Sequence, residues 1–423
     1  MVLIIVISFG ILFVLENTQV DDGGHYTAHE ALVSSSTTTT TDTNNNNNPA
    51  SLRANTSTQQ QQQQEYHDFP SPLDVLSAND AILKIIPLYG SHRPDQDAVF
   101  GFASALRFDC LLRFVGTLVD SGYTGDIVVG VNKAHELDNT TRSFLQYHAT
   151  HSNLIAYPAE LVCKKVKTRT RCKAYKMFLN SKIQGYLPDP RPYREIVQLR
   201  FDYYWAWSTL YSDQARLFLL DTKDLYFQGN PFHGLKPQMA NELTAFQESP
   251  LKTVSDEYQP KIWQQEEKHD VRLVRRLGKK NILTLGAVVG GQPAIEAYTR
   301  AMVEDFDITE CQHLECAQVS HNYLFWSGYL KKRSPQIEEV IMAEQGKSVV
   351  NTLYILSKYG GSSLKEVNVV NDQNQVVNTN GKPSAVVHQY EQDKHLNDVV
   401  EALTGEQQDK WRRIAETLAQ TEG

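Results

Sequence analysis

Two aspartates three residues apart, Asp221 and Asp224, directly follow the continuous apolar run at 217–220. Such a run is typical of a strand that is buried on both faces of a sheet. Carboxylates just beyond the strand can converge on one Mg²⁺ or Mn²⁺, because these ions favour oxygen ligands and are commonly held by one or two carboxylates together with substrate phosphates. The alternative is ordinary turn chemistry, in which both side chains hydrogen-bond to their own backbone.

The segments around this motif alternate between apolar strands and amphipathic helices. Residues 98–103 and 126–131 are predicted strands, and the apolar spacing of residues 110–121 predicts the helix that joins them. Such a unit implies two parallel strands with a right-handed crossover. The same pattern predicts a short strand at 154–157 and a long helix at 193–211. We therefore expect an α/β fold with an open, mostly parallel sheet, in which the acidic motif lies at the carboxyl edge where ligands bind.

The stretches that flank the two aspartates are more specific than the aspartates alone. Phe227-Gln228 and Asn230-Pro231-Phe232 follow them, and residues 385–391 read AVVHQYE. Together these stretches resemble the motifs of a eukaryotic group of nucleotide-diphospho-sugar glycosyltransferases of the GT-A fold. Further segments that match this group in order and spacing are 103–131, 200–204, 281–291 and 320–324. The resemblance implies a GT-A (Rossmann-like) open, mostly parallel sheet with flanking helices, in one large domain.

The resemblance also implies roles for the residues at matching positions. Asp221, Asp224 and His388 would hold Mn²⁺ or Mg²⁺, and Asp224 would also belong to the catalytic residues. A cation there would neutralise the charge that grows on the diphosphate leaving group of a nucleotide-sugar donor. The positions that would contact the donor are Ala103, Ser104, Arg200, Gly286, Gly290, Gly291, Gln318 and Asn322. The alternatives are a surface histidine at position 388, glycines that only form a turn, and an arginine that only caps the sheet.

One position departs from the pattern of the group. An aspartate usually precedes the glutamine of its D-Q-x-x-H-N stretch, whereas Ala317 precedes Gln318 here. An acid at that position could be the general base that activates the acceptor hydroxyl. Glu315 is the candidate catalytic replacement, although side chains two positions apart on a helix point in different directions. The identity of the base stays open, and a catalytically degenerate domain stays an alternative.

These roles predict a glycosyltransferase that moves a sugar from a nucleotide-sugar donor to a glycan or glycoprotein acceptor. A degenerate domain would instead bind a nucleotide or carbohydrate without turnover. A nucleotidyltransferase on a related fold would release pyrophosphate rather than a nucleoside diphosphate. The chain carries 41 Lys and Arg residues against 49 Asp and Glu residues, a net charge of −8, which argues against a nucleic-acid partner.

The N-terminal part differs in composition from the rest. Residues 2–15 are almost entirely apolar, which is short for a membrane span and typical of a signal peptide, the alternative being a buried terminal strand or helix. The polar tracts that follow have little to bury. We expect a signal anchor or signal peptide at 1–16, a disordered stem at 17–75, the glycosyltransferase domain at 76–400 and a C-terminal helix or tail at 401–423. The expected location is the Golgi or endoplasmic reticulum lumen, as a single-pass type II membrane protein held by the N-terminal segment, or secreted if that segment is cleaved.

Five cysteines are too few for a scaffold built on disulfides. In an oxidising lumen, disulfides are expected across two short loops, Cys163–Cys172 and Cys311–Cys316, with Cys110 left over; the alternative is five buried thiols. The first loop contains the run 164–173 (KKVKTRTRCK), in which six residues are basic. The run favours a solvated loop, although an anionic acceptor would also fit it.

Overall fold

The computed structural model describes residues 81–166, 169–257, 275–310, 315–361, 364–365, 367 and 369–421, all of which belong to one compact unit, Ser71–Gly423. The expected signal segment and stem lie outside these residues, and the domain limits stay predictions. Among the described helices, none is both long and apolar enough to cross a membrane. For the described residues, this finding contradicts the prediction of a single-pass type II membrane protein of the Golgi or endoplasmic reticulum lumen.

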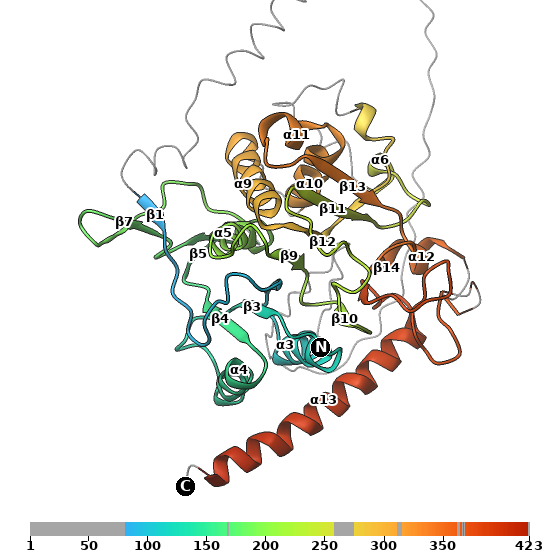
Figure 1. The fold of residues 1–423 in the computed structure, drawn as a ribbon, viewed down its shortest axis with the longest axis horizontal. Helices are drawn as coiled ribbons and strands as arrows, with labels where there is room; N and C mark the ends of the chain where they lie inside the picture. The colour runs from blue at the N-terminus through green and yellow to red at the C-terminus, as the bar shows by residue number, and fades with distance from the viewer. Residues whose placement is uncertain are drawn as a thin grey trace, which may run out of the picture. The chain divides into compact units, whose positions relative to one another are not determined.

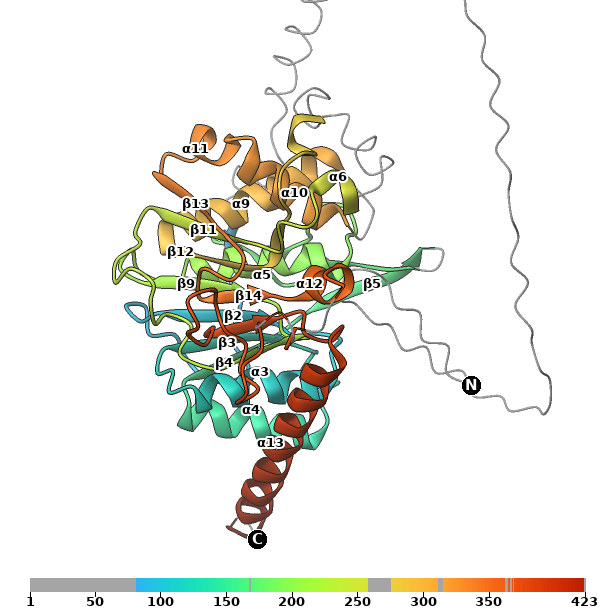
Figure 2. The same cartoon turned by 90° about the vertical axis from the view of Figure 1, so that its right-hand side faces the viewer.

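A seven-stranded sheet lies at the centre of the described structure, in the order β13-β11-β12-β9-β2-β3-β4; Figure 2 shows the strands in this order from top to bottom. Its strands are β2 (Ala98–Phe102), β3 (Asp126–Val131), β4 (Leu154–Pro158), β9 (Arg216–Leu220), β11 (Glu242–Gln247), β12 (Leu283–Gly291) and β13 (Glu339–Ala343). Strands β9, β2, β3 and β4 are mutually parallel, and β12 is antiparallel to both its neighbours. The predicted α/β class with an open, mostly parallel sheet is confirmed.

Helices flank this sheet (Figure 1). They are α3 (Phe108–Asp120), α4 (Asn139–His151), α5 (Ile196–Ser208), α6 (Val254–Glu257), α9 (Gln292–Thr309), α10 (Cys316–Trp326), α11 (Tyr329–Arg333), α12 (Tyr354–Tyr359) and α13 (Lys394–Thr421). The predicted strand–helix–strand unit is β2-α3-β3. The predicted helix at 193–211 is shorter at both ends. A capping box sets its start, because the amide of Glu195 donates to Oε1 of Gln198 at 3.3 Å, and the helix ends at Ser208.

Two hydrophobic cores lie on opposite faces of the sheet, since successive side chains of a strand alternate between faces. In β9, Leu217 and Leu219 join the core under α5, α9 and α10, whereas Phe218 and Leu220 join the core under α3, α4 and α13. All four side chains are at most 3% exposed. The continuous apolar run before Asp221 is therefore explained by burial on both faces.

Short strands extend the fold beyond the central sheet. They are β1 (Ala81–Leu83), β5 (Leu161–Val166), β6 (Arg169–Ala174), β7 (Phe178–Asn180), β8 (Tyr186–Leu187), β10 (Leu225–Phe227), β14 (Val350–Thr352) and β15 (Val386–His388). They form the sheets β1-β7-β8, β10-β15-β14 and β5-β6. The disulfide predicted between Cys163 and Cys172 is present in the β5-β6 hairpin and Cys110 is free, whereas Cys311 lies outside the described residues.

Helix α13 closes one face of the molecule by packing on α3 and α4 (Figures 1 and 2). Trp411 is 5% exposed, and its ring centroid lies 5.0 Å from that of Phe144 and 6.1 Å from that of His148. Burial in this contact, together with the charge of Lys410, lowers the pKa of His148 to about 4. The folded protein, with α13 packed on this side chain, therefore favours the neutral imidazole.

We expect acid to weaken this docking. Below pH 6.5 the unfolded chain binds a proton at His148 that the folded protein excludes until about pH 4, so stability falls as the pH drops through this window. The loss should be about 1–3 kcal/mol at the acid end. Urea unfolding at several pH values measures it, and His148→Phe should make the profile shallower, since His92 and His321, whose pKa values are also lowered by burial, keep their contributions. His135→Asn, at a side chain that is 78% exposed, is the control; equal profiles for both variants would contradict the assignment.

Candidate active site

The loop that follows β9 is fixed to both neighbouring strands. The amide of Asp221 donates to the carbonyl of Gly286 in β12 at 2.9 Å. The hydroxyl of Thr222 donates to the carbonyl of Phe102, the last residue of β2, at 2.9 Å. Because β2 and β9 are parallel, their carboxyl ends meet at one edge of the sheet. The predicted position of the acidic motif at that edge is therefore confirmed.

A second set of strand pairings brings the C-terminal part of the chain to the same place. Strand β10 pairs antiparallel with β15, with Leu225 opposite His388, and β14 pairs with the other side of β15. The amide of Gln389 donates to the carbonyl of Asp224 at 2.8 Å. These bonds hold the imidazole of His388 over the two aspartates.

The three side chains lie close enough together to share one metal ion. Nε2 of His388 lies 3.4 Å from Oδ2 of Asp221 and 3.5 Å from Oδ1 of Asp224, and one ligand atom from each residue lies within 4.8 Å of the others. Adjacent ligands of an octahedral Mg²⁺ are about 3 Å apart, given metal–oxygen bonds of about 2.1 Å. His388 is fully buried, and its Nε2 has no hydrogen-bond partner among the described residues. The donor set of two oxygens and one nitrogen therefore fits a divalent cation.

Charges within the site are strongly coupled. Burial alone would lower the pKa of His388, but the carboxylates of Asp224 and Asp221 outweigh it and raise the pKa to about 10. Burial alone would raise the pKa of Asp221, but Arg200 and His388 hold it below its usual range. The guanidinium of Arg200 bonds to Oδ1 of Asp221, which leaves Oδ2 directed at the imidazole. A protonated imidazole is no ligand, so a cation that used Nε2 would replace its proton.

Gly286 makes room for this cluster. A Cβ added there would lie 2.4 Å from Cε1 of His388 and 2.5 Å from Oδ2 of Asp221. Real Cβ atoms do not approach other atoms so closely; His388 is fully buried, and the partly exposed Asp221 is held by its bond to Arg200. Glycine at this position therefore lets β12 pass directly beneath the ligand atoms.

Gln228 ties the segment that carries His388 to the segment that carries the aspartates. Its Nε2 donates to the carbonyl oxygens of Val376 (2.9 Å) and Ser384 (2.8 Å), and its Oε1 accepts from the amide of Val376 at 2.9 Å. One side chain thus forms hydrogen bonds with three backbone groups in the loop before β15. Gln228 of the Phe227-Gln228 pair therefore stabilises the loop that leads to His388.

Helix α10 contacts β12 through two of the predicted donor residues. Oε1 of Gln318 accepts from the amide of Leu285 at 3.0 Å, and Oδ1 of Asn322 accepts from the amide of Leu283 at 2.9 Å. Both side chains are buried. Their bonds to Leu283 and Leu285 fix the first part of β12, directly before Gly286. A contact of either residue with a donor stays a prediction.

The two residues that bear on the catalytic base lie at the start of α10. Ala317 is fully buried in the core, and Glu315 is the partly exposed N-cap residue, whose carbonyl accepts from the amide of Val319 at 3.0 Å. No measured contact links Glu315 to the three candidate ligands within the described part of the chain. Its catalytic role stays a prediction.

The remaining glycines are separated from the cluster. Gly290 and Gly291 lie four and five residues beyond Gly286 along β12, which places them roughly 13 and 17 Å away at about 3.3 Å per residue. They are opposite Leu217 and Arg216, at the start of β9. A Cβ at either position would collide with backbone atoms of residues 239–242, so close strand packing accounts for both glycines. Of the three predicted glycines, only Gly286 joins the cluster.

The first two donor positions lie where β2 ends. The amide of Ala103 donates to the carbonyl of Gly130 at 2.7 Å, and the hydroxyl of Ser104 donates to Oδ1 of Asn132 at 3.2 Å. Ala103 and Asn132 line a cavity of about 200 Å³ at the carboxyl ends of β2 and β3. Phe102, which precedes Ala103, accepts the bond from Thr222, so this cavity and the cluster share one edge of the sheet.

One buried carboxyl near the cluster was missed from the sequence. Glu248 follows β11, donates its amide to the carbonyl of Ile282 at 2.9 Å and is 5% exposed. Burial raises the pKa of Glu248 to about 7, the charge of His388 lowers it, and Asp224 and Asp221 are among the carboxylates that raise it. Strand β11 runs parallel to β9, since both are antiparallel to β12. The signal that could have found it is an acid directly after the segment 242–247, which the sequence analysis did not identify as a strand.

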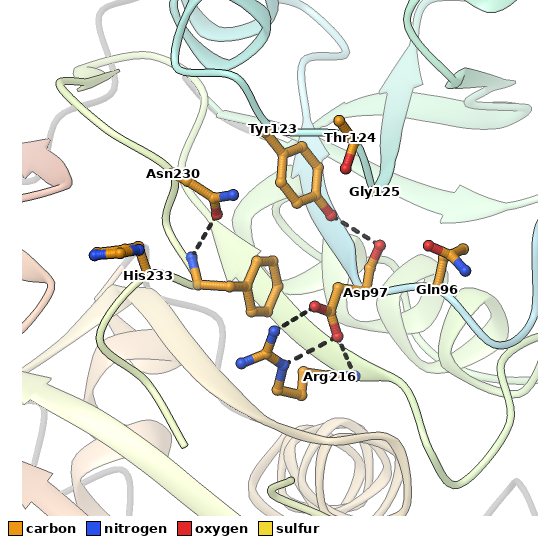
Figure 3. A pocket seen from close by; sticks show the side chains of 9 residues that line it. Gln96, Asp97, Tyr123, Thr124, Gly125, Arg216, Asn230 and His233 are labelled. Carbon is orange, nitrogen blue, oxygen red and sulfur yellow. Dashed lines mark hydrogen bonds and ion pairs between the residues drawn. The ribbon is translucent and has the colours of Figure 1, made fainter. Parts of the chain in front are cut away.

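A second cavity, of about 250 Å³, lies at the opposite edge of the sheet. Figure 3 shows Asp97 and Arg216 in direct contact in its lining; Nε of Arg216 donates to Oδ1 of Asp97 at 3.1 Å, and Nη1 donates to the carbonyl of Lys236 at 2.9 Å. These residues precede β2 or begin β9, so they lie at the amino ends of parallel strands. In this second cavity the charged groups of Asp97 and Arg216 are paired with each other. The candidate site is therefore the cluster of Asp221, Asp224 and His388.

Comparison with known proteins found no matching family model and no matching curated protein. Glycosyltransferases are among the solved structures that are similar. The apo-form glycosyltransferase GlyE of Streptococcus pneumoniae TIGR4 is 12% identical over 76% of this chain, with a TM-score of 0.38, and the match spans 64% of GlyE. The galactosyltransferase LgtC in complex with donor and acceptor sugar analogs is 12% identical, with a TM-score of 0.33. An active-site mutant of LgtC is 10% identical, with a TM-score of 0.36. Each of these two matches covers 69% of this chain and 86% of LgtC. Similarities this low assign neither a substrate nor a mechanism to this chain.

Replacing Gly286 by alanine should disrupt the candidate metal site. The new methyl group would displace His388 or Asp221, and we expect affinity for Mn²⁺ to fall by about tenfold or more. Calorimetric titration of the protein with MnCl₂ measures this change. Gly229→Ala is the matched control, because its Cβ would lie 3.9 Å from the nearest atom, an ordinary contact. Unchanged affinity in folded Gly286→Ala protein would place the cation elsewhere.

Replacing Gln228 by alanine should loosen the segment that carries His388. Three backbone groups lose their partner, which should cost about 2–4 kcal/mol of stability. If the side chain positions the imidazole, the affinity for Mn²⁺ should fall as well under conditions where the protein stays folded. Urea unfolding and the same titration provide the two measurements, with Gln373→Ala at an exposed position as the control. A loss of stability with unaltered affinity would limit Gln228 to a structural role.

Proposed function

We propose that this protein is a glycosyltransferase that moves a sugar from a nucleotide-sugar donor to a glycan or glycoprotein acceptor. The observation that carries the proposal is the cluster of Asp221, Asp224 and His388 at the carboxyl edge of a mostly parallel sheet. Ligands of open α/β sheets bind at that edge. The resemblance of the surrounding motifs to GT-A enzymes supports the same function.

The cluster has the composition to hold Mn²⁺ or Mg²⁺ through two carboxylate oxygens and one imidazole nitrogen. A bound cation would stabilise the negative charge that develops on the diphosphate leaving group. Arg200 orients Asp221 by bonding to Oδ1, so that Oδ2 stays available. Gly286 keeps the space open, and Gln228 holds the strand of His388 in register.

The donor nucleotide is proposed to occupy the cavity lined by Ala103 and Asn132. This cavity offers apolar walls together with amide and charged groups, the mixture typical of small-molecule sites. Thr222 connects its rim to the loop of the two aspartates. A nucleotide in the cavity would therefore extend its diphosphate towards the cluster.

The acceptor hydroxyl needs a base, and two carboxyls are candidates. Glu315 is the residue that the sequence suggests in place of an acid at Ala317. Glu248 is the second candidate, because it is buried beyond the carboxyl end of β11, at the same edge as Asp221. Separate Glu315→Gln and Glu248→Gln variants assign the role.

A screen of nucleotide sugars with MnCl₂ tests the function by measuring the nucleoside diphosphate released during hydrolysis or transfer. Asp221→Asn and Asp224→Asn should each lower the rate by about a hundredfold or more, because each removes a charged ligand. Asp213→Asn is the matched control, since Asp213 is exposed in the loop before β9.

The other outcomes distinguish the alternatives. Binding of a nucleoside diphosphate without turnover of any donor would contradict the enzyme and support a degenerate binding module. Release of pyrophosphate instead of a nucleoside diphosphate would indicate a nucleotidyltransferase. Full activity in both aspartate variants would remove the cluster from the mechanism.

A further inference from the structure

The hairpin of β5 and β6 carries four of its five described basic residues on one face, whereas Lys165 lies on the face of the disulfide. Antiparallel pairing places Cys163 opposite Cys172 and Lys164 opposite Arg171. Side chains alternate along each strand, so the disulfide marks one face and the neighbouring positions form the other. The residues of this second face, the basic face, are Val162, Lys164, Val166, Arg169, Arg171 and Lys173. Four of these six described positions are cationic.

Like charges directly opposite each other destabilise an antiparallel pair, so the basic face is costly for the hairpin. The disulfide between neighbouring positions holds the strands together despite this repulsion. The ring of Tyr193 lies 4.0 Å from Nζ of Lys164 and 5.1 Å from Nζ of Lys173, which places two ammonium groups over one aromatic ring. The disulfide and the ring of Tyr193 therefore hold Lys164 and Lys173 close together.

The hairpin lies at the edge of the sheet that carries the candidate site. It starts three residues after Pro158, the last residue of β4, and β4 is parallel to β3, β2 and β9. The backbone of Cys172 pairs with that of Arg194, just before α5 begins. Arg200, which bonds to Asp221, is the fifth residue of α5 and so lies about 6 Å along the axis from the first. Figure 2 shows the hairpin reaching outward from the body of the molecule.

We propose that the basic face binds an anionic glycan acceptor, one that carries sulfate, phosphate or carboxylate groups. This inference rests on the proposed glycosyl transfer, because the hairpin borders the edge where transfer would occur. The chain as a whole has a net charge of −8, so a concentrated positive face attracts an anion specifically to this edge. Nζ of Lys173 donates to the carbonyl of Asp189 at 3.2 Å, a contact with a neutral group that leaves the charge of Lys173 in place. Arg169 pairs with Glu195 at 3.8 Å, which offsets one of the four charges of the face.

Binding of a heparin octasaccharide to the full chain tests the inference without any turnover. We expect binding that weakens strongly from about 0.05 to about 0.5 M NaCl, as for contacts between charges near the surface. Removing the charges of the basic face should weaken binding by about tenfold or more; the variant carries Lys164→Ala, Arg169→Ala, Arg171→Ala and Lys173→Ala. The control variant removes the same number of exposed charges elsewhere and should bind as the native protein does; it carries Lys331→Ala, Lys332→Ala, Lys382→Ala and Lys394→Ala.

Two further probes make the outcome specific. Poly-glutamate and vesicles containing phosphatidylserine should bind more weakly than the octasaccharide, and equal binding through the same residues would overturn the assignment to a glycan. Absence of octasaccharide binding in a protein that hydrolyses a nucleotide sugar would overturn the inference alone. Octasaccharide binding through the basic face in a protein that turns over no donor would instead contradict the proposed function, and with it the acceptor role.

Discussion

The pairing of β10 with β15 is the interaction on which the candidate site depends. It joins the segment directly after the two aspartates to a segment near the end of the chain and brings His388 over both carboxylates. Buried charges are costly unless they are paired. Here Arg200 and the imidazole face Asp221, and the imidazole also faces Asp224. The same pairing therefore makes the acidic cluster tolerable in the fold and completes its set of ligands.

The parallel part of the sheet concentrates chemistry at one edge. Strands β2, β4, β9 and β11 all end there, and they are followed in turn by Ala103, the basic hairpin, Asp221 and Glu248. Strand β12 runs in the opposite direction through this group, and Gly286 lets its backbone pass under the ligand atoms. The proposed donor cavity, cation site and acceptor surface can share one edge because the carboxyl ends of parallel strands are neighbours.

Sequence reasoning succeeded where the pattern was local. The period of apolar residues located β2, α3, β3 and β9 to within two residues. The resemblance of the flanking motifs to a known group selected Asp221, Asp224 and His388, which the fold brings together. The sequence was less informative where a residue contacts a segment that is distant along the chain. Gln318 and Asn322 bond to the backbone of β12, and Gly290 and Gly291 relieve crowding against residues 239–242. Those contacts join segments that are remote in sequence, so the order of residues along the chain carries little sign of them.

The sequence alone determined the fold class, the acidic motif and its position after a buried strand, because side-chain period and strand burial are properties of a local segment. The tertiary structure decided which distant groups meet: the imidazole above the carboxylates, Arg200 against Asp221, Glu248 beside the cluster and the cations gathered on one face of a hairpin. The physical reason is that strand order and register set these distances, and both arise from packing across the whole sheet.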